Sequence, residues 1–218
     1  MCDDAPRISP PAFGDGPGAT GGFLEIREMV RPVRWEDLFG AEAPVEVEIG
    51  CGNGRYLRRA AGERPGHVFL GVERSLSYAR RAHERKAKYA VANARVLRGD
   101  AARFLSDYAP PGSIHTLHAY FPDPWPKRRH AKRRLLQPAF LETARRALRP
   151  GGLFLLKVDI WWHFEEILCR FERSRGFEVT SNGADVDSGG DLYHLTGFEQ
   201  KALSRKGVVY RMEARRVD

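Results

Sequence analysis

Val45-Glu46-Val47-Glu48-Ile49-Gly50-Cys51-Gly52-Asn53-Gly54 sets the architecture that we predict for this chain of 218 residues. Its first five residues have the β-branched character of a strand, and the glycines that follow allow a tight turn and the close approach of a ligand. Residues 55–61 then have the pattern of a helix. A strand, a glycine-rich turn and a helix in this order are typical of ligand-binding α/β folds, although such a turn can also be purely structural.

Strands and helices alternate along the rest of the chain. We predict further strands at residues 67–73, 94–99, 113–121, 153–158, 177–180 and 207–215, and a polar loop at 183–190. Helices are expected from Ser75, around Phe104 and Leu105, and at 135–148 and 160–174. Residues 23–39 should add a short strand and a turn of helix. This pattern predicts a Rossmann-like α/β fold with a doubly wound, mostly parallel sheet of seven strands.

The composition indicates a globular protein with a polyanionic partner. Residues 1–22 are rich in Pro and Gly and are expected to be a disordered tail, followed by a single domain at 23–218. The net charge of +8 and the pI of about 9.7 favour nucleic acid as a partner. We expect no membrane span, no secretion signal and no metal site, and the scattered Cys2, Cys51 and Cys169 fit a reducing cytoplasm.

Acidic residues stand at or just after the ends of the first five strong strands. They are Glu48, Glu73, Asp100, Asp123 and Asp159. Right-handed crossovers bring the carboxyl ends of parallel strands to one edge of the sheet, and open sheets of this kind bind their ligands there. Each acid alone could be a solvated strand end or a helix cap. Together they predict a site at that edge.

The most unusual segment is Tyr120-Phe121-Pro122-Asp123-Pro124-Trp125-Pro126-Lys127-Arg128-Arg129-His130-Ala131-Lys132-Arg133-Arg134. Its three prolines hold Asp123 and Trp125 in a stiff loop, and six of the eight residues from 127 to 134 are Lys or Arg. A carboxylate joined to a dense cationic segment suits an enzyme that binds a polyanion. The alternatives are a simple turn and a solvated basic face, and Phe121 and Trp125 are either stacking surfaces for bases or packing aromatics.

The acids favour S-adenosylmethionine as the cofactor. Glu73 ends the second strand and is placed to accept hydrogen bonds from ribose hydroxyls. Glu48 precedes the glycine turn, where a carboxylate opposes a pyrophosphate but suits an ammonium or sulfonium cation. Asp100, followed by Ala101, suits the amino group of adenine.

With these motifs the sequence resembles the bacterial tRNA (guanine-N7-)-methyltransferases. The residues that carry the resemblance are the glycine turn with Glu48, Gly71-Val72-Glu73, Gly99-Asp100-Ala101, the segment 121–134, Lys157-Val158-Asp159 and Thr196-Gly197-Phe198-Glu199. The first three motifs are common to many methyltransferases, whereas the Pro-Asp-Pro-Trp-Pro-Lys block is specific. The match covers roughly residues 44–216.

The resemblance implies a class I methyltransferase that methylates N7 of a guanine, usually nucleotide 46, in the variable loop of tRNA. The residues that it implies for the cofactor are Glu48, Gly50, Gly52, Glu73, Asp100, Ala101 and Asp123. Those that it implies for the guanine are Lys127, Asp159, Thr196, Gly197, Phe198 and Glu199, and those for the tRNA backbone are Arg129, Lys132, Arg133 and Arg134. The protein would act as a monomer or a homodimer.

Asp123 is the candidate catalytic residue. N7 of guanine carries a free lone pair, so methylation needs positioning more than a general base, and Asp123 would orient the base and offset its developing positive charge. Two other hypotheses remain: another class I methyltransferase, which the cationic run disfavours, and a non-catalytic RNA-binding module, which the intact acidic residues disfavour.

Overall fold

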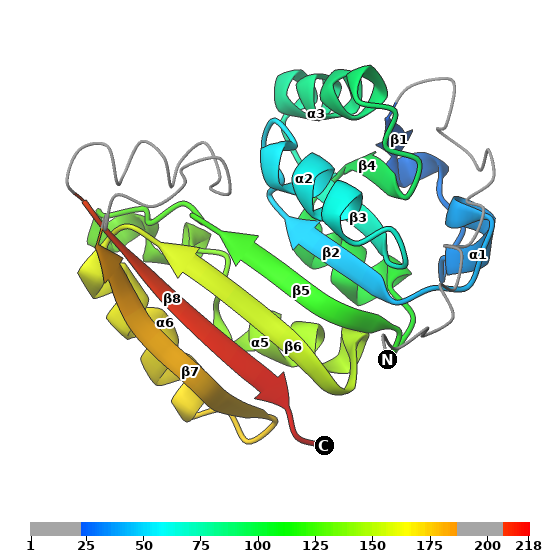
Figure 1. Ribbon diagram of the computed structural model, residues 1–218. Helices are drawn as coiled ribbons and strands as arrows, with labels where there is room; N and C mark the ends of the chain where they lie inside the picture. The colour runs from blue at the N-terminus through cyan, green and yellow to red at the C-terminus, as the bar shows by residue number, and fades with distance from the viewer. Residues whose placement is uncertain (1–22, 187–206) are drawn as a thin grey trace, which may run out of the picture.

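The computed structural model describes residues 23–186 and 207–218, which form an eight-stranded sheet with helices on both faces (Figure 1). The strands lie in the order β1-β4-β3-β2-β5-β6-β8-β7. The six parallel strands are β1 (Leu24–Glu25), β2 (Val45–Ile49), β3 (Val68–Glu73), β4 (Ala94–Arg98), β5 (Ile114–Tyr120) and β6 (Leu148–Val158). Two more strands complete the sheet: β8 (Val208–Arg216) runs antiparallel to both of its neighbours, β6 and β7 (Phe177–Val186).

The predicted doubly wound, mostly parallel α/β fold is confirmed, with eight strands and not seven. The eighth is the two-residue β1, which pairs with β4 at the edge of the sheet and lies in residues 23–39, where a short strand was predicted. Element boundaries also differ, as at the end of β7. β7 continues to Val186 because its backbone pairs with β8 past a register shift, so residues 183–186 are strand and not loop. The expected disordered tail at residues 1–22 lies outside the described residues.

Helices cover both faces of the sheet. One face carries α2 (Arg55–Glu63) and α3 (Leu76–Lys88), and the other carries α5 (Pro138–Ala147) and α6 (Trp161–Glu172) (Figure 1). Two further helices are short, α1 (Trp35–Phe39) and α4 (Ala101–Arg103). α4 continues into a helical turn at Phe104–Tyr108. α5 begins three residues later than predicted, because Pro138 needs no hydrogen bond for its missing N–H and suits the first turn.

Each face has its own apolar core. The larger cluster joins the central strands to α5 and α6 and includes Phe104, Leu117, Phe154 and Ile167. The smaller cluster packs α2 and α3 onto β3 and β4 through small side chains such as Ala79 and Ala82. These alanines let α3 approach α2 closely. This packing holds the loops after β2, β3 and β4 at one edge of the sheet.

Candidate active site

A cleft of about 1090 Å³ lies at the carboxyl edge of the parallel strands. Four of the five predicted strand-end acids line it, namely Glu48, Glu73, Asp100 and Asp123. Gly50, Gly52 and Ala101 line it as well. The structure therefore brings these residues together in one cleft, whereas Asp159, which follows β6 at the same edge of the sheet, is exposed outside the cleft lining. The loop Thr196–Glu199 lies outside the described residues.

The glycine turn leaves the floor of the cleft open. Gly52 has a φ of +54°, and a Cβ built on it would meet no protein atom within 4 Å, so the space beside it is free for a ligand. Gly54, with a φ of +69°, has a different role: a Cβ there would lie 2.9 Å from the Cβ of Ala82. Gly54 thus permits the contact with α3, whereas Gly52 shapes the site.

Glu73 is held in place by backbone amides. Its two carboxylate oxygens accept hydrogen bonds from Gly52 N at 2.9 Å and from Ser75 N at 2.7 Å. Since a carboxylate has about four acceptor positions, two remain for a ligand. Asp100 is fixed in a similar way, because its Oδ1 accepts from Arg103 N at 3.0 Å and caps α4. Both acids are therefore oriented before a ligand binds.

Glu48 is a buried acid with an unsatisfied oxygen. Its side chain is 5% exposed, and Oε2 has no hydrogen-bond partner among the described residues. Burial, with a further contribution from the charge of Glu73, raises the pKa of Glu48 to about 8. A buried acceptor without a hydrogen-bond partner lowers the stability of the fold unless a ligand supplies that partner. A positively charged ligand fits this position, because it stabilises the ionised carboxylate.

The loop after β5 is strained where it borders the cleft. Phe121 and Trp125 have φ values of 53° and 42°, which are rare for residues with side chains. Such strain costs of order 1–3 kcal/mol per residue and concentrates at functional sites. Between them Asp123 is exposed, and no hydrogen bond or ion pair joins it to any described residue. Its carboxylate is thus available at the cleft wall.

Comparison with known proteins shows the family of this chain. Residues 42–212 match a family model described as "Putative methyltransferase". The tRNA (guanine-N(7)-)-methyltransferase of Streptococcus pneumoniae (strain 70585) is 32% identical over 195 residues, covering 88% of this chain and 90% of that protein. The chain belongs to the tRNA (guanine-N(7)-)-methyltransferase family. Its resemblance to that family and its nature as a methyltransferase, both expected from the motifs, are confirmed.

Solved methyltransferase structures share the fold of this family member. The 16S rRNA methyltransferase KamB superposes with a TM-score of 0.62 at 15% identity, covering 87% of this chain and 100% of that one. A mutant 16S rRNA (adenine(1408)-N(1))-methyltransferase from Catenulisporales acidiphilia, solved with its cosubstrate SAM, superposes with a TM-score of 0.59 at 17% identity. It covers 82% of this chain and 88% of its own.

The family's basic segment forms a 3-10 helix at Arg128–Arg133. Lys127, Arg129, Lys132 and Arg133 are exposed, and Arg133 also lines the cleft. The Arg133 guanidinium lies 5.1 Å from the centre of the Trp125 ring, and the His130 ring lies edge-on to the same indole at 5.7 Å. Trp125 therefore packs within its loop, as one of the two alternatives predicted, and it also borders the cleft.

Arg134 has a different role from the one predicted. Its side chain is only 10% exposed and donates to the carbonyl oxygens of Pro124 at 2.8 Å and Trp125 at 3.1 Å. It also forms an ion pair with Glu166 on α6. Because its guanidinium forms these hydrogen bonds and this ion pair, Arg134 holds the strained loop to α6 and is not available to bind a phosphate. We therefore omit Arg134 from the set of proposed tRNA contacts.

Replacing Arg134 by Lys should loosen this loop although the charge is kept. The ammonium group of Lys lacks the planar set of N–H donors with which Arg forms hydrogen bonds to two carbonyl oxygens and a carboxylate at once. We expect a loss of about 1–3 kcal/mol in the free energy of unfolding, since buried acceptors lose their partners. Urea unfolding measures the effect, with Lys132→Arg as the matched exposed control. Equal stability of the two variants would show that Arg134 does not fasten the loop.

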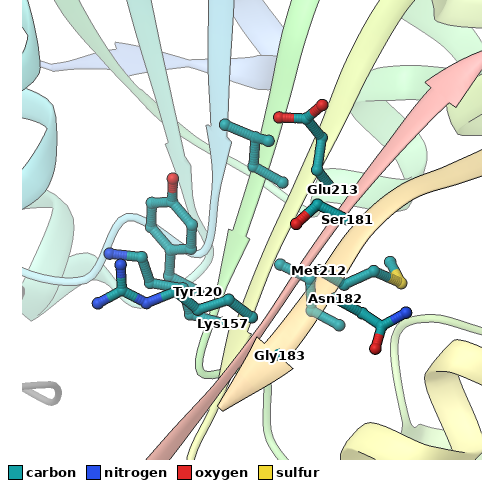
Figure 2. Close-up of a pocket in the computed structure, with 10 residues that line it drawn as sticks. Tyr120, Lys157, Ser181, Asn182, Gly183, Met212 and Glu213 are labelled. Carbon is teal, nitrogen blue, oxygen red and sulfur yellow. The ribbon is translucent and has the colours of Figure 1, made fainter. Parts of the chain in front are cut away.

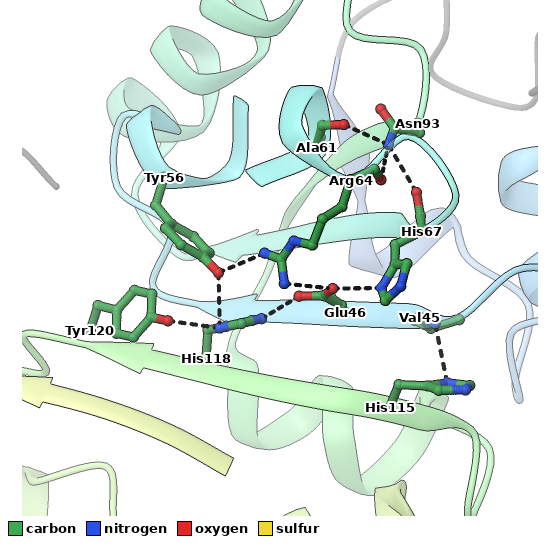
Figure 3. A network of polar contacts seen from close by, with 10 residues as sticks. All are labelled: Val45, Glu46, Tyr56, Ala61, Arg64, His67, Asn93, His115, His118 and Tyr120. Atoms are coloured by element: carbon green, nitrogen blue, oxygen red, sulfur yellow. Dashed lines mark hydrogen bonds and ion pairs between the residues drawn. The ribbon is translucent and has the colours of Figure 1, made fainter. Parts of the chain in front are cut away.

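A buried polar network lies beneath the cleft and was missed from the sequence (Figure 3). Glu46 on β2 is 1% exposed and pairs with Arg64 at 3.0 Å, with His67 Nδ1 at 2.7 Å and with His118 Nε2 at 2.7 Å. His118 Nδ1 faces the hydroxyls of Tyr56 at 3.2 Å and Tyr120 at 2.9 Å. Both tyrosines line the cleft. The alternation of Glu46 and Glu48 in an otherwise apolar strand was the only sequence signal.

The charge state of this network follows from its geometry. Burial raises the pKa of Glu46, but the hydrogen bond from His118 and the positive charge of Arg64 outweigh it, so the pKa lies below its usual value. Burial lowers the pKa of His118, which is therefore neutral. Its Nε2–H donates to Glu46, and Nδ1 accepts from a tyrosine hydroxyl. The network links the cleft wall to the interior of the sheet.

A second cavity of about 330 Å³ opens on the face of β6, β7 and β8 (Figure 2). Tyr120 borders both cavities, and Lys157, Asn182 and Glu213 line the smaller one. Glu213 accepts a hydrogen bond from Thr180 Oγ1 at 2.7 Å. Because this cavity contains none of the strand-end acids and no part of the glycine turn, the larger cleft is the candidate active site.

Metal and membrane features are not found in the described part of the chain. Within residues 23–186 and 207–218, no three His, Cys, Asp or Glu side chains gather as a metal site. In the same ranges no helix has the length and apolar character needed to cross a bilayer.

Proposed function

We propose that this protein transfers a methyl group from S-adenosylmethionine to N7 of a guanine in tRNA, at nucleotide 46 of the variable loop. The observation that carries the proposal is the composition of the cleft wall: Asp123 and Arg133 line the same cavity as Glu48 and Glu73. An acidic cofactor site and a basic segment thus share one cleft. The S. pneumoniae relative's name, which specifies tRNA and guanine N7, supports the same substrate.

Each acidic residue of the cleft suits a different part of the cofactor. Glu73 has free acceptor positions for ribose hydroxyls, and Asp100 with Ala101 stands where the adenine would lie. Glu48 offers its unpaired oxygen to a cation. When bound, S-adenosylmethionine supplies an electrophilic methyl group on a sulfonium that leaves readily. Gly50 and Gly52 keep the floor clear of side chains.

The protein's part in the reaction is to position the base. N7 of guanine has its lone pair exposed at neutral pH, so no proton must be removed before it attacks. Asp123 orients the guanine and balances the positive charge that develops on its ring. Lys127, Asp159 and the stretch Thr196–Glu199 would hold the base, and Arg129, Lys132 and Arg133 would hold the tRNA backbone. Orientation of this kind contributes up to roughly 7–11 kcal/mol to lowering a barrier.

Direct assay of the product tests the function. The protein is incubated with S-adenosylmethionine labelled in its methyl group and with a tRNA transcript, which is then digested to nucleosides. We expect label in 7-methylguanosine, and none in a matched transcript with adenine in place of guanine 46. Label in another nucleoside would indicate a different class I methyltransferase. Binding of tRNA without any labelled product would indicate a non-catalytic RNA-binding module.

Replacing Glu73 by Ala should weaken cofactor binding. The variant loses charged hydrogen bonds to the ribose, each worth about 1.5–3 kcal/mol, and also the anchor of Gly52 N. Calorimetric titration with the cofactor alone measures the loss, with exposed Glu84→Ala as the control. Unchanged affinity in a folded Glu73→Ala protein would remove this residue from the site.

Cofactor binding should release a proton from Glu48. With a pKa of about 8, the carboxyl is largely protonated at pH 7, and a positively charged ligand favours its ionised form. Titration at pH 7 in two buffers of different ionisation enthalpy should give apparent binding enthalpies that differ accordingly. Glu48→Gln should show no such difference. Wild-type enthalpies that do not depend on the buffer would contradict a charge change at Glu48.

The same pKa predicts how stability depends on pH without a ligand. The folded state binds more protons than the unfolded state between the ordinary pKa of 4.5 and about 8, so Glu48 makes stability fall as the pH rises through this window. Glu48→Gln should therefore gain stability relative to wild type as the pH rises from 5 to 8. Thermal unfolding across this range provides the measurement, and a constant difference between the two proteins would contradict the raised pKa.

A further inference from the structure

Arginines and tyrosines form a continuous surface on α2 and α3, across the cleft from the basic 3-10 helix. We call the set Arg55, Arg58, Tyr78, Arg81, Arg85 and Tyr89 the α2–α3 surface. Arg55, Tyr78 and Arg81 line the cleft, so the surface begins at its rim. The two helices lie next to each other on the same face of the sheet, as Figure 1 shows. The cleft therefore has cationic residues on both walls.

The residues of this surface that belong to α3 lie along one face of that helix. Tyr78, Arg81 and Arg85 are three and four residues apart, a spacing that places them on the same helical face, and Tyr89 follows after one more turn. Tyr78 and Tyr89 are 42% and 53% exposed. The guanidinium of Arg58 lies 4.4 Å from the Tyr89 ring centre, and that of Arg81 lies 5.9 Å from the Tyr78 ring centre. Cations are thus interleaved with exposed aromatic rings.

Three of the arginines on this surface have charges that are not balanced within the described protein. Of its arginines, Arg58, Arg81 and Arg85 have no ion pair with any described residue. Arg85 is partly buried with its Nε unpartnered, and burial together with the neighbouring charges of Arg55 and Arg58 lowers its pKa. Like charges gathered in this way destabilise the free protein. A polyanion would relieve the repulsion.

We propose that the α2–α3 surface is a second RNA-contact surface, which holds the part of the substrate that flanks the methylated nucleotide. The proposal rests on the proposed tRNA substrate and extends it to the opposite wall of the cleft. The arginines contact phosphates, and Tyr78 and Tyr89 offer stacking surfaces for unpaired bases. RNA then crosses the cleft, between this surface and the segment with Arg129, Lys132 and Arg133, and presents its guanine to the acids between them.

Charge removal away from the cofactor cleft tests the proposal. The double variant Arg58→Gln/Arg85→Gln removes two cations that do not line the cleft. The matched control is Arg80→Gln/Arg175→Gln, which removes the same charge at two exposed sites outside the α2–α3 surface. Affinity for a tRNA transcript is measured at several salt concentrations, together with cofactor affinity and thermal unfolding.

We expect the slope of log affinity against log salt concentration to fall by about two for the test variant, and by much less for the control. Cofactor affinity should stay at the wild-type value, and the melting temperature should not fall, because removing like charges relieves their repulsion. Tyr89→Ala should weaken tRNA binding by about fivefold or more with an unchanged salt slope, because stacking involves no ion release. A salt slope equal to that of the control would overturn the proposal.

The outcomes separate this inference from the proposed function. If the wild-type protein neither binds tRNA nor produces 7-methylguanosine, the proposed function fails, and the inference fails with it. If wild type methylates guanine 46 but Arg58→Gln/Arg85→Gln keeps the control's salt slope, only the α2–α3 surface is refuted. In the expected case the double variant raises the KM for tRNA while kcat at saturating tRNA is retained.

Discussion

Replacing Asp123 by Asn should lower the rate of methyl transfer by about a hundredfold or more while leaving the fold intact, comparable to the loss of one electrostatic contact to a transition state. The variant keeps the shape of the side chain and removes its charge. Asp123 is exposed at the cleft wall without a partner in the described protein, so its loss breaks no structural contact. Its role must then appear in turnover and not in stability.

Single-turnover kinetics with saturating cofactor and tRNA measure this effect. Asp123→Asn should melt within a few degrees of wild type and still bind tRNA. Asp37→Asn, which changes an exposed acid on α1, is the matched control and should react at the wild-type rate. If Asp123→Asn also keeps a near-normal rate, charge at this position is not needed, and the assignment of Asp123 as the residue that orients guanine is wrong.

Replacing Glu46 by Ala should cost about 3–5 kcal/mol of folding free energy, the largest effect on stability that we expect. The substitution removes the partner of Arg64 and the acceptor for His118 in a site that is 1% exposed. Both groups are then left without the carboxylate that pairs with them. Because His118 contacts Tyr56 and Tyr120 at the cleft, cofactor binding should weaken as well.

Urea unfolding at pH 7 measures the loss, with Glu28→Ala as the control, because the Arg27–Glu28 pair is exposed and worth less than about 1 kcal/mol. The pH dependence gives a second check. The pKa of Glu46 is lowered in the folded state, so its stabilisation is present above the ordinary value of 4.5 and is lost as the pH falls below it. Equal stability of Glu46→Ala and Glu28→Ala would show that the network does not stabilise the fold.

Local patterns determined the sheet and the acidic part of the cleft. Strand runs that end in Glu48, Glu73, Asp100 and Asp123 need only the parallel, right-handed topology to meet at one edge. The structure brings these four together in the cleft. Asp159 follows the same rule but lies outside the cleft lining, because the position of a strand within the sheet, and not its end alone, decides which loops share a cavity.

Only the tertiary structure decided which basic side chains line the cleft and which form contacts inside the protein. Within one run of basic residues, Arg133 lines the cleft whereas Arg134 is fastened to Pro124, Trp125 and Glu166. No sequence pattern separates these neighbours, because their difference depends on where α6 packs. The same holds for Glu46 and Tyr120, which are 74 residues apart in sequence and meet through His118 only when β2 and β5 pair. Sequence sets the order and ends of the strands through local periodicity, while the partner of each buried charge is set by contacts between distant segments.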